Sequence, residues 1–508
     1  MSTQENISSP LQGAEARRVA RNASAMAVAR ILTSALLFFW QIALTNALGD
    51  AQFGVYGTIN ALFVIAASFC NFGLSLIVIR EVARNPAHSG KILSTTLFIQ
   101  TITMGIAFVG MNIVPVVLGY PLDIRALTAV AALSLFADTF ASMAYDQLLA
   151  HERMVIATVI DLAHIVLRIG ISLLVLAAGY GLLGMYIVTV ISGSLRAVIF
   201  WLFLTRQNIK PQFPLDRALL KSLLTAALPL MVAAFINLTY TQLDKLMSTS
   251  LLTEADTGHL SAAFVIVAGI VEVLSTTILV AIYPMLSRAY QGEGDNSVFQ
   301  FIVEKLSYFT LLIGLPLGLI FTLFADAITV PLFGEDFRPS ADILRILVWY
   351  AVITMVVNVY AQGMMSANRQ VRYVGIRASG LAVKLILNLL LMTQIGVIGA
   401  AIASVIAELI VLIIVMRVDI FRFDHINWRW QRLLRLAVIG VITAIVMILL
   451  GTIHPILGII SAVFYIPAIL WGRALAQDDY DLLYRLLAAV PGGSLILRFW
   501  KRDTSLNW

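Results

Sequence analysis

Ionised side chains stand inside long apolar stretches of this sequence, where removing them from water is costly. Arg168 and Arg196 lie near the middle of two such stretches, and Lys384 lies near the middle of a third. Two carboxylates, Glu272 and Glu408, occupy a comparable depth. Ionisable residues at membrane depth usually face a cavity or one another, and they mark substrate or ion pathways. These five residues are therefore the first candidates for a binding site.

Further charges accompany them. Arg30 lies near one end of an apolar stretch, from which its guanidinium could reach the interface. Asp138 and Asp161 are carboxylates within the fourth and fifth stretches. Asp244 and Lys245 are adjacent, near the outer end of their stretch. Because neighbours on a helix do not face each other, we predict that these two are not a local pair but lie at an outer gate.

Two interpretations of these charges stay open for any single residue. The carboxylates could neutralise several of the cations in ion pairs between helices. Alternatively, cations lining a cavity could bind an anionic ligand, and guanidinium and ammonium groups suit a diphosphate. For the set as a whole we favour a lining role. The predicted substrate-binding cations are Arg30, Arg168, Arg196 and Lys384, and the predicted carboxylates for coupling or ion pairing are Asp138, Asp161, Glu272 and Glu408.

The composition identifies the elements that must position these charges. The chain has 508 residues, of which 60% are hydrophobic and 12% charged, whereas soluble domains carry about 25% charged residues. We therefore predict an all-α polytopic membrane protein with about 14 transmembrane helices. The predicted spans are 24–47, 53–77, 92–117, 126–147, 154–178, 182–204, 222–247, 259–284, 305–325, 343–364, 373–394, 397–416, 433–452 and 455–473. Turns are expected at 179–181 and 451–455, where glycine and proline interrupt the apolar sequence.

The distribution of basic residues among the loops predicts how the chain is oriented in the membrane. Basic residues outnumber acidic ones, 34 to 28, and they concentrate in alternate loops, whereas the intervening loops are short or acidic. The positive-inside rule therefore places both termini in the cytoplasm. Because the charges are spread between apolar runs rather than clustered on one face, we expect no nucleic-acid binding.

A weak internal repeat divides the chain. Tyr145-Asp146-Gln147 matches Tyr360-Ala361-Gln362, and Arg168 falls against Lys384 at almost the same offset. Six spans per copy predict two parallel lobes around a central cavity whose access alternates. The predicted segments are 1–23 (cytoplasmic), 24–210 (first lobe), 211–420 (second lobe), 421–473 (two extra spans) and 474–508 (cytoplasmic interfacial tail). The extra residues of the second copy are expected in longer loops at 285–300 and 326–342.

Several enzyme signatures are absent. The sequence has no P-loop, no H-E-x-x-H, no Cys/His metal spacing and no G-x-S-x-G. We therefore predict no catalytic residues, no metal site and no cofactor. The driving force is then an ion gradient (H+ or Na+), the membrane potential or the substrate gradient.

Several segments resemble a known family. They are Leu48–Gly57, Gly73, Arg80–Arg84, Leu228-Pro229 with Tyr240 and Asp244, Leu332–Phe337, and Ser366–Arg369. Together they resemble the polysaccharide-transporter family of O-antigen and exopolysaccharide flippases. Its superfamily also holds the lipid II flippase and the multidrug and toxin extrusion transporters.

The resemblance implies a fold and a function. It implies two six-helix lobes in a V around a cationic cavity, with the last two spans forming a groove for a lipid tail. It further implies that the protein moves an undecaprenyl-diphosphate-linked oligosaccharide between the leaflets of a bacterial inner membrane. A polysaccharide polymerase and a chain-length regulator are further candidate partners, besides the lipid-linked substrate and the bilayer.

Other functions remain as alternatives. A cation-coupled multidrug exporter would favour an acidic cavity, whereas these central charges lean basic. A membrane-embedded polysaccharide polymerase or ligase would be expected to carry a large outer loop, whereas the outer loops here are small. A scaffold protein would not explain the charges within the membrane.

Overall fold

The computed structural model describes residues 10–276, 283, 285–292, 294–419, 430–472 and 474–475. Side chains are described from residue 32 onward, apart from those of residues 275, 276, 430 and 470. Within these ranges the regular elements are all helical, which confirms the predicted all-α class.

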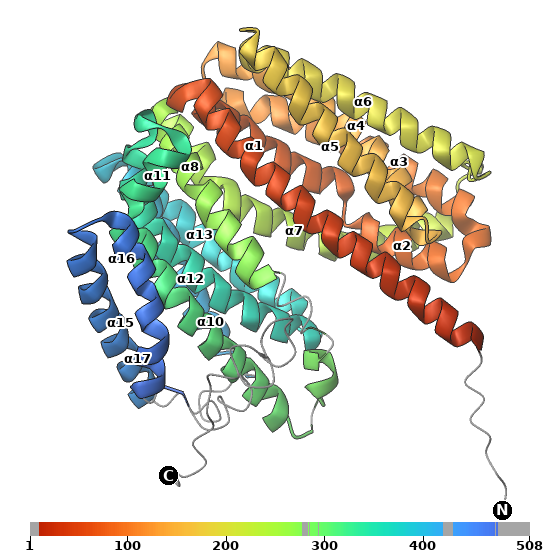
Figure 1. Ribbon diagram of the computed structural model, residues 1–508. Coiled ribbons are helices and arrows are strands. Elements are labelled where there is room, and N and C mark those ends of the chain that lie inside the picture. Colours follow the sequence, from red (N-terminus) through yellow and green to blue (C-terminus); the bar gives the residue numbers. More distant parts are fainter. Residues whose placement is uncertain are drawn as a thin grey trace, which may run out of the picture. The chain divides into compact units, whose positions relative to one another are not determined.

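Within the described ranges, mostly short connections join successive helices (Figure 1). In the first part of the chain they are α1 (Pro10–Asn71), α2 (Leu74–Arg84), α3 (Ser89–Val117), α4 (Leu122–Ala150), α5 (Met154–Ala177), α6 (Gly181–Arg206), α7 (Arg217–Leu251) and α8 (Glu254–Val271). They continue with α10 (Ser297–Leu323), α11 (Ala325–Phe333), α12 (Pro339–Ser366), α13 (Gln370–Ile395), α14 (Val397–Met416), α15 (Trp430–Gly451), α16 (Pro455–Ser461) and α17 (Tyr465–Trp471). Short helical turns lie at Pro86–His88 (η1), Glu272–Thr276 (η2), Glu335–Phe337 (η3) and Ala462–Phe464 (η5).

Twelve of the described helical segments are long and apolar enough to cross a membrane. The first, Leu32–Arg84, has 53 residues and contains a kink at Gly49, whose φ of 73° lies in the left-handed region. Since about 20 residues suffice for one crossing, this segment provides two. With the shorter apolar segment Pro455–Ile469, the helices account for the predicted spans, so the polytopic class is confirmed.

Two local predictions need correction. The span expected at 53–77 is not continuous, because α1 ends at Asn71 and α2 begins at Leu74. Phe72 (φ 53°) and Gly73 (φ 67°) both adopt left-handed conformations between them. The loop expected at 326–342 is largely helical, because α11 and η3 occupy most of it. The turns expected at 179–181 and 451–455 are confirmed.

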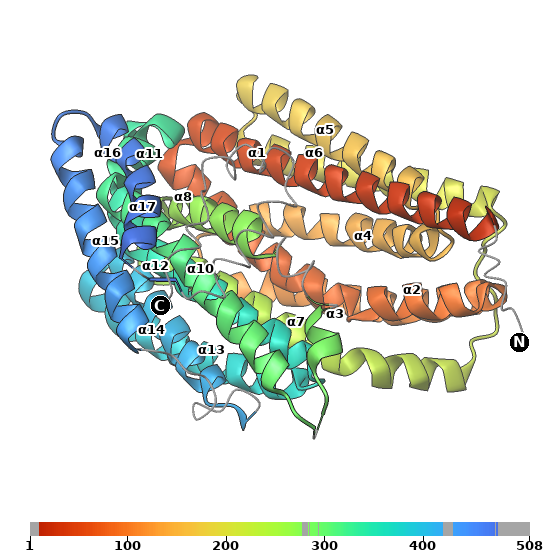
Figure 2. The same ribbon diagram turned by 60° about the horizontal axis from the view of Figure 1, so that its bottom comes forward.

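The chain forms two compact units. The described part of the first comprises residues 10–269, 329–343 and 371–407, so it joins elements of both predicted lobes. Within it, α4 packs against both α3 and α6, and α1 packs along α7 (Figures 1 and 2). The second unit contains α10, most of α12 and the C-terminal helices α15 to α17. The predicted lobe boundaries and the V-shaped arrangement remain predictions.

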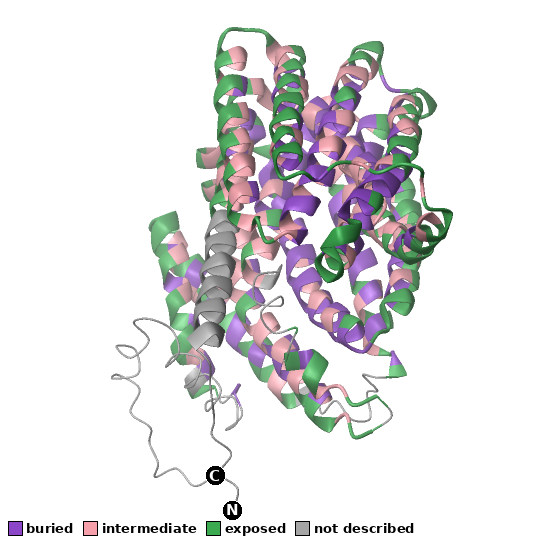
Figure 3. Ribbon diagram, turned by 90° about the vertical axis from the view of Figure 1, so that its right-hand side faces the viewer, coloured by how far each residue is buried: buried purple, intermediate pink, exposed green. Residues whose placement is uncertain are grey.

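Burial follows the contacts between helices. Figure 3 shows buried residues along the faces where helices meet and exposed residues on the outer faces. Large apolar side chains are exposed there, for example Val117 (77%) and Leu174 (71%). Extended apolar surface of this kind marks a membrane-facing or interaction surface. It fits the lipid-facing side of a transmembrane bundle.

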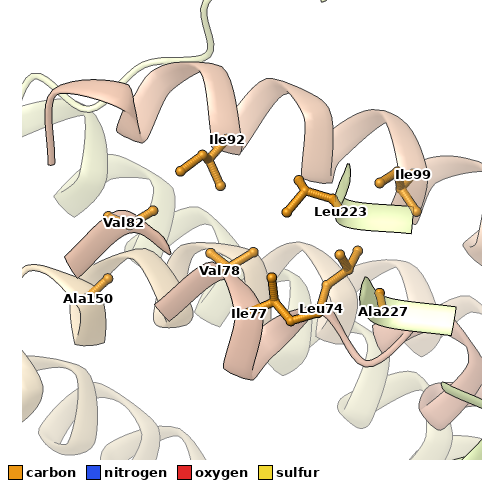
Figure 4. Packing of buried hydrophobic residues seen from close by; sticks show 9 residues of the cluster. All are labelled: Leu74, Ile77, Val78, Val82, Ile92, Ile99, Ala150, Leu223 and Ala227. Carbon is orange, nitrogen blue, oxygen red and sulfur yellow. The ribbon is translucent and has the colours of Figure 1, made fainter. Parts of the chain in front are cut away.

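A buried cluster fixes α2 in the first unit. It contains Leu74, Ile77, Val78 and Val82 of α2, Ile92 and Ile99 of α3, Ala150 of α4, and Leu223 and Ala227 of α7 (Figure 4). The short helix α2 is therefore held between α4 and the N-terminal part of α7. In the second unit, Tyr308 on α10 donates a hydrogen bond to the Ala474 carbonyl (2.6 Å), which ties the C-terminal helices to α10.

Candidate functional site

A guanidinium between two carboxylates lies within the first unit. Arg196 on α6 donates from Nη1 to Asp138 Oδ1 on α4 at 3.1 Å. Its Nε lies 2.8 Å from Asp161 Oδ1 on α5, although the N–H is not directed at that oxygen. Because three helices contribute, this ion-pair network fixes α4, α5 and α6 relative to one another.

A cavity of about 80 Å³ adjoins this network. A cavity needs about 10–15 Å³ to hold one water molecule, so this cavity has room for several waters or a small polar group. It is enclosed by α1, α4, α5 and α6, and its polar and aromatic lining includes Trp40, Tyr56, Asn60, Asp138, Arg168, Tyr186 and Thr189. The predicted residues Arg168 and Asp138 therefore share one cavity.

Arg168 differs from Arg196 and Lys384, the other predicted cations whose side chains are described. It is half-buried on α5 and lines the cavity. No acidic side chain within the described ranges lies close enough to form an ion pair with it. The two carboxylates nearby, Asp138 and Asp161, are already engaged by Arg196. The Arg168 guanidinium therefore remains available to an anion entering the cavity.

Lys384 lies in a second, fully buried site. Its Nζ is 2.6 Å from Asp244 Oδ2, and both side chains are 0% exposed. It also donates to the Tyr240 carbonyl at 3.0 Å. Asp244 accepts two more hydrogen bonds, from Asn388 Nδ2 and from Ser404 Oγ, each at 2.8 Å. The pair thus joins α7 to α13 and α14, and Lys384 can reach a ligand only if this ion pair opens.

A stacked cation extends this site along α13. The Arg377 guanidinium lies 4.8 Å from the ring centroid of Tyr240 and 5.6 Å from that of Tyr373. Its Nε donates to the Tyr373 hydroxyl at 2.8 Å. Arg377 is not among the predicted substrate-binding cations, although it lies seven residues before Lys384 within the same predicted span. The signal was the spacing of Tyr373 and Arg377, which places both side chains on one face of the helix.

The remaining predicted residues lie elsewhere. Lys245 is directed at the Phe264 ring of α8, 5.8 Å from its centroid, whereas Asp244 pairs with Lys384. The gate role of Asp244 and Lys245 remains a prediction. Glu272 lies in η2 and Glu408 on α14, both in the second unit. Arg30 lies on α1 in the stretch whose side chains are outside the described set.

A network of hydroxyl groups lies at the contact between α1 and the C-terminal end of α7. The sequence did not indicate this network. Thr58 and Thr249 share a hydrogen bond, Thr249 donates to Thr257 at 3.1 Å, and Thr257 donates to Ser248 at 3.0 Å. These four residues are named the Thr58 seam. The approach is close because Gly54 lies against α8, where a Cβ would collide with the backbone of Glu254. Small residues at such helix crossings were the available signal.

A histidine lies on the same side of α1. His259 Nε2 is 3.0 Å from the Asp336 carbonyl and 3.4 Å from Asp50 Oδ2. Arg338, directly after η3, binds Glu335 of η3 through two hydrogen bonds of 2.9 Å and thereby lowers the pKa of that carboxyl. These contacts connect η3 to the neighbouring helices of the first unit.

Comparison with known proteins places the chain in a family. Residues 19–290, more than half of the chain, match the family described as polysaccharide biosynthesis protein. The chain belongs to this family. The family expected from the sequence motifs is therefore confirmed.

A curated protein and several solved structures are similar to this chain. The chain is 21% identical over 393 residues to the probable low-salt glycan biosynthesis flippase Agl15 of Haloferax volcanii, and the match covers 76% of this chain and 80% of that protein. Its fold is similar to that of the lipid II flippase MurJ in an inward closed conformation, with a TM-score of 0.71 at 14% identity over 88% of this chain and 98% of MurJ. An inward-facing multidrug transporter of the MATE family gives a TM-score of 0.59 at 16% identity, over 79% and 94% of the two chains.

Proposed function

We propose that this member of the polysaccharide biosynthesis family is a flippase for lipid-linked oligosaccharides. Its substrate would be an undecaprenyl-diphosphate-linked repeat unit, moved from the cytoplasmic to the outer leaflet of a bacterial inner membrane by alternating access. Family membership and the similarity to Agl15 support the class of function. The observation that carries the proposal is Arg168, a cavity-lining cation that forms no ion pair with any carboxylate of the described residues.

The diphosphate is the part of such a substrate that Arg168 can recognise. A guanidinium presents paired donors that match phosphate oxygens, and charge-assisted hydrogen bonds are about twice as strong as neutral ones. Arg196 is held by two carboxylates and Lys384 is buried against a third. Of these three predicted cations, Arg168 is therefore the one that a diphosphate in the cavity could bind without breaking an ion pair.

Reconstitution in liposomes tests this proposal. Purified protein is reconstituted with a fluorescent undecaprenyl-diphosphate oligosaccharide, and its appearance in the opposite leaflet is followed. Arg168→Ala is expected to slow translocation about 10- to 100-fold, because a hydrogen bond to a charged group is worth about 1.5–3 kcal/mol. Arg168→Lys should retain part of the activity, since it keeps the charge but loses the paired donors.

The matched control is Arg206→Ala, which removes an exposed arginine at the end of α6, away from the cavity lining. It should translocate at the rate of the unmodified protein. If Arg168→Ala also translocates at that rate while folding normally, the assignment of the diphosphate to Arg168 is wrong.

Export of organic cations is a second candidate function. One observation favours it, namely that the Asp138 carboxylate lines the cavity beside the aromatic rings of Trp40 and Tyr56. Aromatic faces and a carboxylate together bind organic cations. Efflux of a cationic dye that is abolished by Asp138→Asn, together with no movement of the lipid-linked oligosaccharide, would favour export over flipping.

The proposal extends to the energy source and the partners. A proton or sodium gradient is proposed to drive the cycle, since the sequence carries no nucleotide-binding loop. A polymerase and a chain-length regulator would take over the translocated unit.

A further inference from the structure

The second membrane crossing is interrupted within its length. Its first part is the C-terminal half of α1, which ends at Asn71, and its second part is α2, which begins at Leu74. Phe72 and Gly73 between them have φ values of 53° and 67°. Breaks of this kind free backbone groups inside the membrane, and discontinuous helices commonly build ion and substrate sites there.

Side chains of α3 bind the carbonyls that the break exposes. Thr103 Oγ1 donates to the Cys70 carbonyl at 3.1 Å, and Gln100 Nε2 donates to the Asn71 carbonyl at 3.2 Å. Gln100 is 2% exposed, and its Oε1 accepts no hydrogen bond from the described part of the chain. The break therefore lies in a buried polar environment with an unused acceptor.

A carboxyl group faces the other side of the break. Asp146 on α4 is 6% exposed, and its Oδ1 lies 2.6 Å from Ser75 Oγ in the first turn of α2. This hydroxyl is the one hydrogen-bond donor that the described residues offer to Asp146, and none of their cations forms an ion pair with it. Asp146 thus differs from Asp138, Asp161 and Asp244, which are all paired with cations.

The charged and titratable groups on the helices around α4 fall into three sets, which are paired, exposed or half-buried. On α2, Arg80 and Arg84 both pair with Glu81 at its exposed end. On the other helices packed against α4 the described charged or titratable groups include Asp50 (near His259), Lys91 (exposed), Asp161 and Arg196 (paired), and His164 and Arg168 (half-buried), while Tyr145 and His151 belong to the C-terminal end of α4 itself.

Two opposing effects act on the Asp146 proton. Burial without a compensating cation favours the neutral acid. A short O–H···O⁻ hydrogen bond from Ser75 and the positive end of the α2 dipole favour the carboxylate. Because these effects oppose each other, a small displacement of α2 can change which form of Asp146 is preferred.

The opposite side of α2 contacts α7. A Cβ on Gly73 would lie 2.7 Å from Leu230 Cβ and 3.0 Å from the Met231 nitrogen, so the break touches the α7 backbone. The cluster of Figure 4 continues this contact through Leu223 and Ala227. If α2 moves relative to Asp146, the packing of α2 on α7 therefore changes as well.

We propose that Asp146 and Ser75 form a proton-binding site that controls the contact between α2 and α7. In this proposal the ionised carboxylate holds the first turn of α2 on α4 through the Ser75 hydrogen bond. Taking up one proton from hydronium converts the carboxylate to the acid, weakens this attachment and lets α2 move with α7. The proton's role as coupling ion rests on the proposed flippase function, whereas proton binding itself does not.

The test measures the distance between α2 and α7 by spin-label spectroscopy in the full-length protein in nanodiscs. Labels are placed at Arg84→Cys and Lys221→Cys, both exposed, in a Cys70→Ala background. The distance distribution is expected to change between mildly acidic and mildly alkaline pH, equally in sodium and potassium salts. Asp146→Asn is expected to remove this pH response, because the amide cannot ionise.

Three further variants test whether the pH response comes from Asp146. His88→Gln and His151→Gln should retain the pH response, which excludes the two histidines closest to this end of α4 and α3. Ser75→Ala keeps the carboxyl but removes its donor, so it should move the midpoint of the response while preserving its amplitude. This variant also covers the case in which Asp146→Asn does not fold.

Several results would overturn the proposal. They are a pH response that persists in Asp146→Asn, an unchanged midpoint in Ser75→Ala, or a response to sodium at constant pH. The outcomes also separate the two proposals. A protein that translocates lipid-linked oligosaccharide but shows no pH response contradicts only the proton site, whereas a pH response without translocation contradicts only the flippase function.

Discussion

Lys384 and Arg168 carry the same charge but have different electrostatic surroundings. Lys384 is fully buried and makes an ion pair with Asp244, whose carboxylate accepts two further hydrogen bonds. Arg168 lines a cavity and has no ion-pair partner in the described ranges. A ligand can bind Lys384 only after the ion pair with Asp244 is broken, whereas a ligand can bind Arg168 without breaking an ion pair. The two cations therefore suit different tasks, helix attachment and anion recognition.

The buried pair gives a prediction at the same scale. Lys384→Met leaves the Asp244 carboxylate uncompensated, and losing one partner of a buried pair costs about 3–5 kcal/mol. The melting temperature of the purified protein should therefore fall clearly. The double variant Lys384→Met with Asp244→Asn should recover much of the loss, since no buried charge remains. Equal melting temperatures for the single and double variants would contradict the view that Lys384 neutralises the Asp244 carboxylate.

At the level of elements, α7 is held at both of its ends. Near its N-terminus it packs on α2 through the apolar cluster, and near its C-terminus it meets α1 at the Thr58 seam. Apolar packing resists separation by excluding water. Hydroxyl pairs at a close helix crossing add directional bonds of modest strength, about 0.5–1.5 kcal/mol each. Of the two contacts, the Thr58 seam is therefore the one whose bonds can be exchanged for water at small cost.

A cross-link tests whether this seam opens during transport. In a Cys70→Ala background, Thr58→Cys with Thr249→Cys should form a disulfide readily, because the two hydroxyls are in direct contact. We expect the oxidised protein to lose lipid translocation and the reduced protein to regain it. The single variant Thr58→Cys, treated with the same oxidant, is the control and should stay active. Full activity of the cross-linked protein would mean that the seam remains closed throughout the cycle.

At the level of the whole molecule, the fold is similar to those of MurJ and of a MATE transporter, although sequence identity is only 14% and 16%. A shared fold at such identity does not transfer a substrate, because function depends on the residues of the site. The orientation in the membrane is likewise a separate matter, and it rests on the distribution of basic residues in the loops.

The orientation is tested with two single-cysteine variants in the Cys70→Ala background. Lys210→Cys lies in the exposed basic loop before α7, and Glu335→Cys lies in the exposed acidic turn η3. In intact bacterial cells with a permeabilised outer membrane, a membrane-impermeant maleimide should label position 335 but not position 210. Labelling in inverted membrane vesicles should show the reverse. The opposite pattern would invert the predicted topology.

The sequence alone determined the membrane class, the positions of most spans and the family. These properties follow from composition, from the length of apolar runs and from local motifs, none of which requires knowledge of how the helices pack.

The tertiary structure decided which charges meet. Nothing in the sequence around Lys384 indicates that it points at Asp244 of α7 rather than into a cavity, because that depends on how each helix is rotated in the bundle. The break at Phe72 was equally hidden, because the groups that meet it come from distant helices: α3 binds the Asn71 carbonyl and α7 packs against Gly73. Asp146 became a candidate site only when the helices around it were seen to supply one hydroxyl and no cation.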